Sequence, residues 1–204
     1  SFTLGDLAVK RQMILKRLEE EGVLDMNREL EFPLFPQRIA VISSRSAAGY
    51  TDFIKHISEN SYGYVFYTAL FEAAMQGTET ETSIIEALDR IAEKIELFDV
   101  IVIIRGGGSQ TDLSWFDNYN IAYYITQFPL PVLTGIGHEK DLSVTDIVAY
   151  KALKTPTAVA DFLISCANEA ENNLMETLSG IISFTRDIML DYKHKVETFS
   201  MKIN

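Results

Sequence analysis

The feature that most constrains the fold is the stretch from Val100 to Asp112, which reads VIVIIRGGGSQTD. Five branched apolar residues in a row are typical of a strand that is buried on both faces of a sheet. Three consecutive glycines then let the backbone turn sharply and approach a ligand, and their amides can bind an anion beside a guanidinium. The stretch therefore predicts a buried strand followed by a phosphate or other anion site. Its candidate ligands are Arg105, Gly106, Gly107, Gly108 and Ser109.

Strands alternate with helices on both sides of this stretch. Further apolar runs predict strands at Arg38–Ser44, Tyr64–Leu70 and Pro131–Thr134. Helical spacing is found at Glu79–Leu97 and from Asp117, as N-cap, to about Gln127. Such alternation is typical of parallel strands joined by right-handed crossovers. The predicted fold class is therefore α/β, with a parallel, doubly wound, Rossmann-like sheet of about four or more strands.

Helices are predicted at both ends of the chain. Leu4–Gly22 has an apolar stripe and a basic stripe, and a basic face of this kind is usually solvated. Prolines then mark an extended connector, and the pattern is helical again from Thr155-Pro156 to Lys202. We expect an N-terminal helix and connector at residues 1–36, an α/β catalytic domain at 37–163, and the start of a C-terminal, coiled-coil-like helical extension at 164–204.

Composition limits the classes of protein that fit. The net charge of −11 argues against a chain coated with nucleic-acid-binding charge, although it leaves room for a local basic cleft. No apolar run approaches the ~20 residues of a membrane span, and no signal peptide is evident. The single cysteine, Cys166, excludes an intrachain disulfide and fits a reducing cytoplasm. Because the sequence lacks an initiator Met and stops within a helical pattern, we expect a piece of a longer protein.

Polar loops follow the carboxyl ends of three predicted strands, where ligands bind in sheets of this kind. They read SSRS, RGGGS and GHEKD. In the third loop His138 lies close in sequence to Glu139, Asp141 and Asp146, and a nearby carboxylate can tune a histidine for proton transfer. His56 and His194 lack such surroundings in the sequence and are predicted to be structural or solvated, without a functional role. Asp52, after the first loop, is either a favourable charge near a helix start or a catalytic group.

Taken together, these segments resemble the large subunit of bacterial exonuclease VII. The matching pieces are RIAVISS, MQG at Met75–Gly77, RGGGSQTDLSWFD, PLPVLTGIGHEKDLSVTDIVAY and KTPTAVADFL. The resemblance implies a cytoplasmic exodeoxyribonuclease that degrades single-stranded DNA from both ends to short oligonucleotides. It also implies small subunits bound to the C-terminal helical extension. An N-terminal OB-type domain and most of that extension are absent from this sequence.

The resemblance carries a catalytic role over to Asp52, Arg105, His138 and Asp141. The resulting hypothesis is that Arg105 and the amides of Gly106–Ser109 hold the phosphate. His138 then acts as general acid or base, with Asp141 orienting it. The family does not depend strictly on a divalent metal, so no cofactor is required, and Asp52 and Asp141 are the candidates for an optional Mg²⁺. Lys140 stands where the family usually has a small polar residue, which adds positive charge beside the site.

Two other function classes stay open at this point. The first is a phosphotransferase-like, nucleotide-binding domain of the kind that uses a GGDG-type loop, as in NAD kinase, although Gly108 replaces the acid of that loop. The second is a non-catalytic assembly module whose helical extension binds partners or a second copy of the chain. We expect no membrane partner in any of these cases.

Overall fold

The structure is a computed structural model of the 204-residue chain and describes residues 4–106, 113–137 and 142–203. The chain divides into two compact units, Ser1–Cys166 and Ala167–Asn204. We describe each unit by itself. The three-part domain division expected from the sequence stays a prediction.

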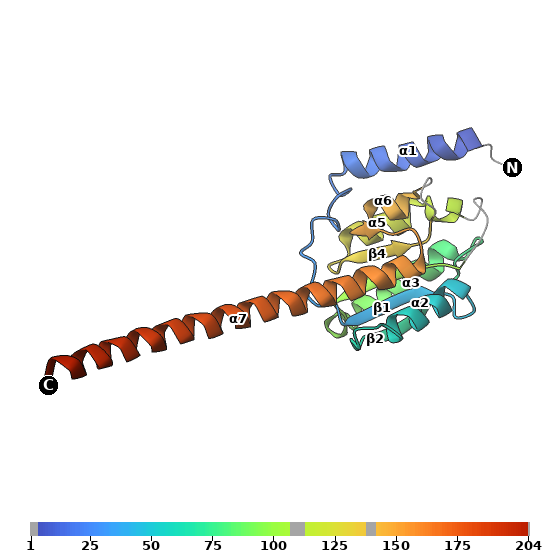
Figure 1. The fold of residues 1–204 in the computed structure, drawn as a ribbon. Coiled ribbons are helices and arrows are strands. Elements are labelled where there is room, and N and C mark those ends of the chain that lie inside the picture. Colours follow the sequence, from blue (N-terminus) through green and yellow to red (C-terminus); the bar gives the residue numbers. More distant parts are fainter. Residues whose placement is uncertain (1–3, 107–112, 138–141, 204) are drawn as a thin grey trace. The chain divides into compact units, whose positions relative to one another are not determined.

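The first unit is built on a five-stranded parallel sheet with the strand order β2-β1-β3-β4-β5 (Figure 1). The strands are β1 (Arg38–Ser43), β2 (Tyr67–Glu72), β3 (Val100–Ile104), β4 (Val132–Gly135) and β5 (Lys151–Ala152). From β1 the chain runs outward to β2 on one side, and from β3 it runs to β4 and β5 on the other. The order therefore reverses between β1 and β3. This sheet confirms the predicted parallel, doubly wound α/β fold.

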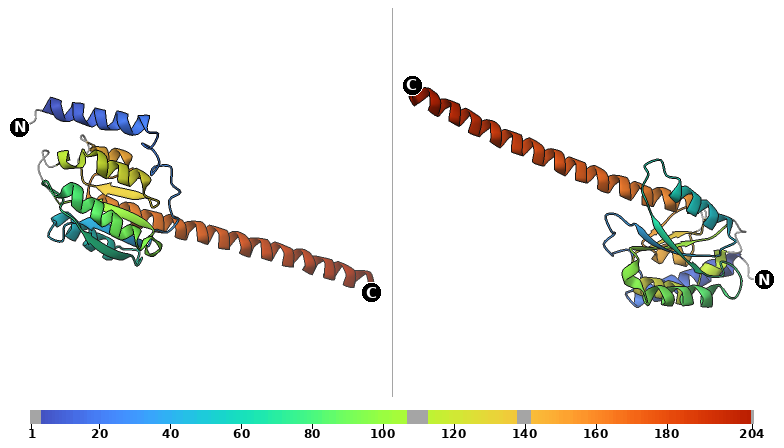
Figure 2. Two further views of the ribbon diagram at one scale, coloured as in Figure 1. Left: turned by 180° about the vertical axis from the view of Figure 1, so that it is seen from behind. Right: turned by 90° about the horizontal axis from the view of Figure 1, so that it is seen from below.

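Helices cover both faces of the sheet because successive strand residues point to opposite faces. Helices α3 (Thr80–Ala92), α5 (Tyr119–Gln127) and α6 (Val144–Val148) lie on one face, with α1 (Leu4–Glu20) packed against the same cluster. Helix α2 (Ala48–Ser58) and the first turns of α7 (Pro156–Ile203) lie on the other. Figure 2 shows the sheet between these two layers.

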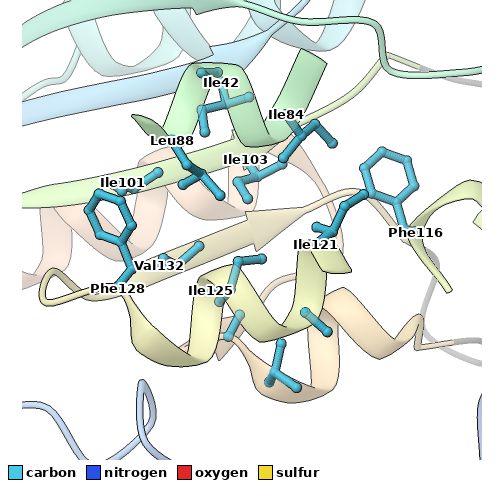
Figure 3. Close-up of a cluster of buried hydrophobic side chains, with 14 of the residues drawn as sticks. Ile42, Ile84, Leu88, Ile101, Ile103, Phe116, Ile121, Ile125, Phe128 and Val132 are labelled. Atoms are coloured by element: carbon cyan, nitrogen blue, oxygen red, sulfur yellow. The ribbon is translucent and has the colours of Figure 1, made fainter. Parts of the chain in front are cut away.

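The alternation is visible along β1, where Ile39 and Val41 face α2 while Ala40 and Ile42 face α3. Figure 3 shows the cluster on the α3 face, in which strand residues meet side chains of α3 and α5. Its labelled members include Ile42, Ile101, Ile103, Val132, Ile84, Leu88, Ile121 and Ile125. These side chains are fully buried, and a second buried cluster lies on the α2 face, so the sheet has an apolar core on both faces.

The connector after α1 is held by a buried asparagine. Asn27 is fully buried, and its side-chain nitrogen donates hydrogen bonds to the carbonyls of Phe128 and Leu130. Its side-chain oxygen accepts from the amides of Val132 and Tyr150. One side chain thus joins the connector to the start of β4 and to the segment before β5.

Two expected boundaries are wrong for local reasons. The N-cap of α5 is Asn118, whose side chain accepts from the amides of Asn120 and Ile121, whereas Asp117 is used elsewhere. Strand β2 starts at Tyr67 and not at Tyr64, because the side chain of Asn60 bonds both the amide and the carbonyl of Tyr64 and holds it outside the strand. The predicted helix at 79–97 is α3 followed by the short helix η1 (Ile95–Leu97).

The second unit consists of the continuation of α7, which Gly180 does not interrupt. Many of its large apolar side chains are exposed. They include Leu174, Leu178, Ile181, Ile182, Phe184, Ile188, Met189, Tyr192, Val196 and Phe199. Among the helices that the structure describes, none is both long enough and apolar enough to pass through a membrane.

Asp99 anchors the amino ends of β1 and β3 and gives the fold a pH dependence. Burial opposes its ionisation, but hydrogen bonds from the side chain and amide of Arg38 and from the amide of Gln37 outweigh burial and lower the pKa of the carboxyl. The native state therefore favours the carboxylate. Its stabilisation is present above the ordinary pKa of aspartate and is lost as the pH falls through the lowered value.

We therefore expect Asp99→Asn to lower the free energy of unfolding by about 1–2 kcal/mol at pH 7. The expected effect is modest because the guanidinium of Arg38 is exposed, and solvent weakens its attraction to the carboxylate. Urea unfolding at pH 7 and pH 3 should show the difference from wild type shrinking in acid. Asp25→Asn is the control, because Asp25 pairs with Arg28 on the surface. A difference for Asp99→Asn that is the same at both pH values would contradict the assignment.

Candidate active site

A cavity of about 370 Å³ opens at the carboxyl edge of the sheet, where the strand order reverses. Segments that directly follow three strands line it. They are Ser44, Ser46, Ala47 and Ala48 after β1, Ala74, Met75 and Gln76 after β2, and Arg105 and Gly106 after β3. Doubly wound sheets bind ligands at this position, because the crossovers on the two sides diverge there and leave a crevice.

Arg105 provides a fixed positive charge in this cavity. It follows the last residue of β3, and only 7% of its surface is exposed. The hydroxyl of Ser43 donates a 2.8 Å hydrogen bond to the carbonyl of Ile104, which ties the end of β1 to the end of β3 next to Arg105. A guanidinium stays protonated even when buried, and its planar set of donors matches phosphate oxygens.

The start of α2 adds backbone donors to the same cavity. Ala47 precedes the helix in an extended conformation, and its side chain does not cap it. The first amides of a helix lack intrahelical partners and carry partial positive charge, so they favour an anion. A Cβ atom at Gly106 would lie 3.2 Å from the backbone nitrogen of Ala48. The absence of a side chain at Gly106 therefore keeps the start of α2 accessible beside Arg105.

Gly49 sets the distance between α2 and the end of β3. A Cβ atom at this position would lie 2.2 Å from the carbonyl oxygen of Arg105 and 2.8 Å from Cγ of Pro156. No side chain fits without a shift of the backbone. The first turns of α2 and α7 and the end of β3 therefore pack together only because residue 49 is glycine.

We expect Gly49→Ala to lower the free energy of unfolding by about 1–3 kcal/mol, because the added methyl group forces backbone apart. Thermal unfolding followed by circular dichroism measures the change. Gly180→Ala is the matched control, since a Cβ atom there meets nothing within 4 Å. That change should stabilise its helix by about 0.5–1 kcal/mol. Equal stability of Gly49→Ala and wild type would contradict the packing argument.

The structure brings together two of the residues predicted for the site, Arg105 and Gly106. Gly107, Gly108, Ser109, His138 and Asp141 lie outside the described residues, and their roles stay predictions. The segments that carry them leave the sheet side by side, because Ile104 and Gly135 are partners in the register of β3 and β4. Neighbouring strands lie about 4.8 Å apart, so the two loops start next to each other.

The structure does not place Asp52 in the cavity of Arg105. Asp52 is exposed on α2 and lines a second cavity of about 560 Å³ with residues of α2, the following turn and α7. In that cavity Nε2 of His56 lies 2.5 Å from Oδ1 of Asp161. The sequence around His56 does not reveal this carboxylate, since its partner is 105 residues away in the sequence.

Asp146, which the sequence places close to His138, is occupied by contacts within the protein. It forms a capping box with Ser143 at the start of α6, and it accepts a 2.6 Å hydrogen bond from the hydroxyl of Thr134. Burial raises the pKa of this carboxyl, against the hydrogen bonds from Thr134 and Ser143, and the nearby Asp117 carboxylate raises it further. Asp146 thus links the end of β4 to the start of α6.

Three polar residues of the cavity were missed as individual candidates. Ser44 and Ser46 belong to the SSRS loop, and their hydroxyl oxygens lie 3.1 Å apart. Gln76 belongs to the MQG segment, and its side chain is exposed at the cavity. The sequence feature that identifies them is their position directly after the carboxyl ends of β1 and β2.

The described part of the chain holds no group of three or more His, Cys, Asp or Glu side chains that could bind a metal ion. Of the two carboxylates proposed for Mg²⁺, Asp52 is described and Asp141 is not. An optional metal at these two residues stays a prediction.

Comparisons of the sequence with family models and with curated proteins agree on one family. The family model described as "Exonuclease VII, large subunit" matches residues 23–204. A protein from Clostridium botulinum (strain Hall), named exodeoxyribonuclease 7 large subunit, is 32% identical over 204 residues, which cover 97% of this chain and 50% of the relative. A protein of the same name from Campylobacter lari is 33% identical over 195 residues, with 96% and 50% covered. The chain spans about half the length of these curated relatives.

Proposed function

The chain belongs to the family of the exonuclease VII large subunit, and from this premise we propose that it carries the catalytic site of an exodeoxyribonuclease. The proposed substrate is single-stranded DNA, cleaved from both ends to short oligonucleotides. The observation that supports the proposal most directly is the cavity formed by Arg105, Gly106 and the uncapped start of α2. Its charge and backbone donors suit one phosphate group of a DNA strand.

The proposed mechanism is hydrolysis of a phosphodiester bond. Arg105 and the amides around Gly106 hold the phosphate and stabilise the negative charge that develops on its oxygens. Water attacks phosphorus and loses a proton, while the bond to the leaving sugar oxygen breaks and that oxygen gains a proton. His138 is the candidate for these proton transfers, and Asp141 is the candidate that orients it.

The role proposed for Asp52 differs from those of Arg105 and His138. Because Asp52 lines a different cavity from Arg105, we assign it no direct contact with a phosphate that Arg105 holds. Its carboxylate would position the attacking water or, with Asp141, hold an optional Mg²⁺. When bound, such an ion would neutralise charge on the phosphate oxygens.

The partner surface in the proposal is the second unit. Its exposed apolar side chains, Ile181, Phe184 and Val196 among them, leave large apolar areas open to solvent, which is typical of helices that bind other helices. We assign this surface to the small subunits and to self-association of large subunits. The bacterial cytoplasm is the compartment that goes with this proposal.

The proposal is tested with the full-length large subunit assembled with its small subunits. End-labelled single-stranded and double-stranded DNA of one sequence are compared as substrates, with and without a metal chelator. We expect short oligonucleotides from the single strand only, in both conditions. A complex that assembles but leaves single-stranded DNA intact would instead support the non-catalytic assembly module.

A further inference from the structure

Asp117 lies at the contact between two segments of the chain, the one that follows the glycine-rich stretch and the one that follows the histidine-containing stretch. It comes directly after the short helix η2 (Ser114–Phe116), and Val144 is the first residue of α6. Oδ1 of Asp117 accepts a 2.9 Å hydrogen bond from the amide of Val144. A second bond joins the same segments, from the hydroxyl of Thr145 to the carbonyl of Phe116 at 2.8 Å. The downstream ends of the glycine-rich and histidine-containing segments are therefore joined to each other.

Asp117 is a buried carboxylate, and the positive charge that balances it comes from helix α1. Only 1% of its surface is exposed, and an unpaired carboxylate in such a place would be costly. The guanidinium of Arg11 on α1 supplies the opposite charge. Its Nε donates to Oδ1 at 3.0 Å and its Nη2 to Oδ2 at 2.9 Å. Two parallel bonds of this kind fix the plane of a carboxylate, which a single point charge cannot do.

This contact joins two parts of the chain that are far apart in the sequence. Arg11 and Asp117 are 106 residues apart, and residues before 23 lie outside the region that the family model matches. Ile14 and Leu18 of α1 also pack into the apolar cluster of the sheet. The helix therefore packs on the apolar cluster of the sheet. Arg11 adds a polar contact with Asp117, at the point where η2 meets the start of α6.

We propose that Arg11 and Asp117 are positioning residues for the nuclease reaction, through which the packing of α1 fixes the contact between η2 and the start of α6, the described segments that follow the glycine-rich and histidine-containing stretches. The inference rests on the proposed function, because it assumes that Arg105 and His138 act on one phosphate. Arg11 orients the carboxylate of Asp117, and Asp117 in turn holds the amide of Val144. Loss of Arg11 leaves the residues that are proposed to touch DNA unchanged and loosens the contact between η2 and the start of α6.

The test uses Arg11→Gln, Arg11→Lys and the control Arg17→Gln in the full-length large subunit with its small subunits. Arg17 lies on the same helix, and its guanidinium stacks on the ring of Tyr119 of α5 at 3.7 Å. The control therefore removes a contact of α1 that does not involve Asp117. We expect Arg11→Gln to lower kcat by about 10- to 100-fold, with KM changed less than about threefold. Arg11→Lys should restore part of the loss, and Arg17→Gln should stay within about twofold of wild type.

Hydrogen exchange of the Val144 amide provides a readout that does not depend on activity. We expect it to exchange about tenfold faster in Arg11→Gln and at the wild-type rate in Arg17→Gln. Unchanged exchange in Arg11→Gln, or equal effects of the two substitutions, would overturn the proposal. A wild-type complex that cleaves no DNA would refute the proposed function. An active complex whose kcat is insensitive to Arg11→Gln would refute only the positioning role.

Discussion

Replacing Arg105 with glutamine is expected to lower kcat for single-stranded DNA by about 10²–10³-fold. Arg105 is 7% exposed and lies in a cavity with the uncapped start of α2, so its charge is screened little by water. Glutamine keeps donor atoms on a somewhat shorter side chain and loses the charge. The loss should therefore appear in the chemical step, where negative charge develops on the phosphate oxygens. Single-turnover cleavage of end-labelled DNA measures that step directly.

Two further variants sharpen the result for Arg105. Arg105→Lys keeps the charge without the planar pair of donors, so we expect a rate between those of wild type and Arg105→Gln. Arg90→Gln is the matched control, because Arg90 lies on α3 and bonds only the carbonyl of Glu72 among the described contacts of its side chain. It should stay within about twofold of wild type. Cleavage by Arg105→Gln at the wild-type rate would remove the phosphate site from the mechanism.

Replacing His138 with asparagine is expected to lower kcat by about 10²–10⁴-fold, which is the usual contribution of a general acid or base. His138 is three residues beyond Gly135, and Gly135 is the register partner of Ile104. In the sequence, His138 therefore follows the strand that pairs with the one that Arg105 follows. The pH dependence of kcat should also lose the limb near neutrality that an imidazole gives.

His56→Asn is the comparison that makes the histidine assignment decisive. His56 is paired with the carboxylate of Asp161 in the cavity that also holds Asp52. We expect its replacement to change kcat by less than about threefold and to leave the pH profile intact. A large loss in His56→Asn together with an active His138→Asn would move the proton-transfer role to the second cavity.

The fold follows from features that are readable along the chain. Strands β1 and β3 are runs of branched apolar residues, and each is followed by polar or glycine-rich sequence. Alternation of strand and helix signals leads directly to a parallel sheet with helices on both faces, because parallel strands need crossovers. The carboxyl-edge cavity was predictable for the same reason. The loops that contain Ser44 and Arg105 follow strands that run in one direction, so they meet at one edge.

The errors concern competition between neighbouring polar residues. Asp117 and Asn118 are both good N-caps by type, and local sequence does not separate them. Asn118 caps α5 in the structure because Arg11 and the amide of Val144 engage the carboxylate of Asp117. Tyr64 likewise has a strand-forming side chain, but Asn60 holds its backbone outside the strand. In each case a side-chain hydrogen bond overrides an intrinsic preference.

The local sequence thus specifies the sheet, the order of its elements and the arginine at its carboxyl edge, because hydrophobic period and glycine content act over a few residues. It does not specify the pairs Arg11 with Asp117, His56 with Asp161 and Asn27 with Val132, whose members are more than 100 residues apart. A charged or amide side chain has many partners that would satisfy it equally well. Packing of α1, α7 and the connector onto the completed sheet selects one of them, and with it the cavity to which each polar residue belongs.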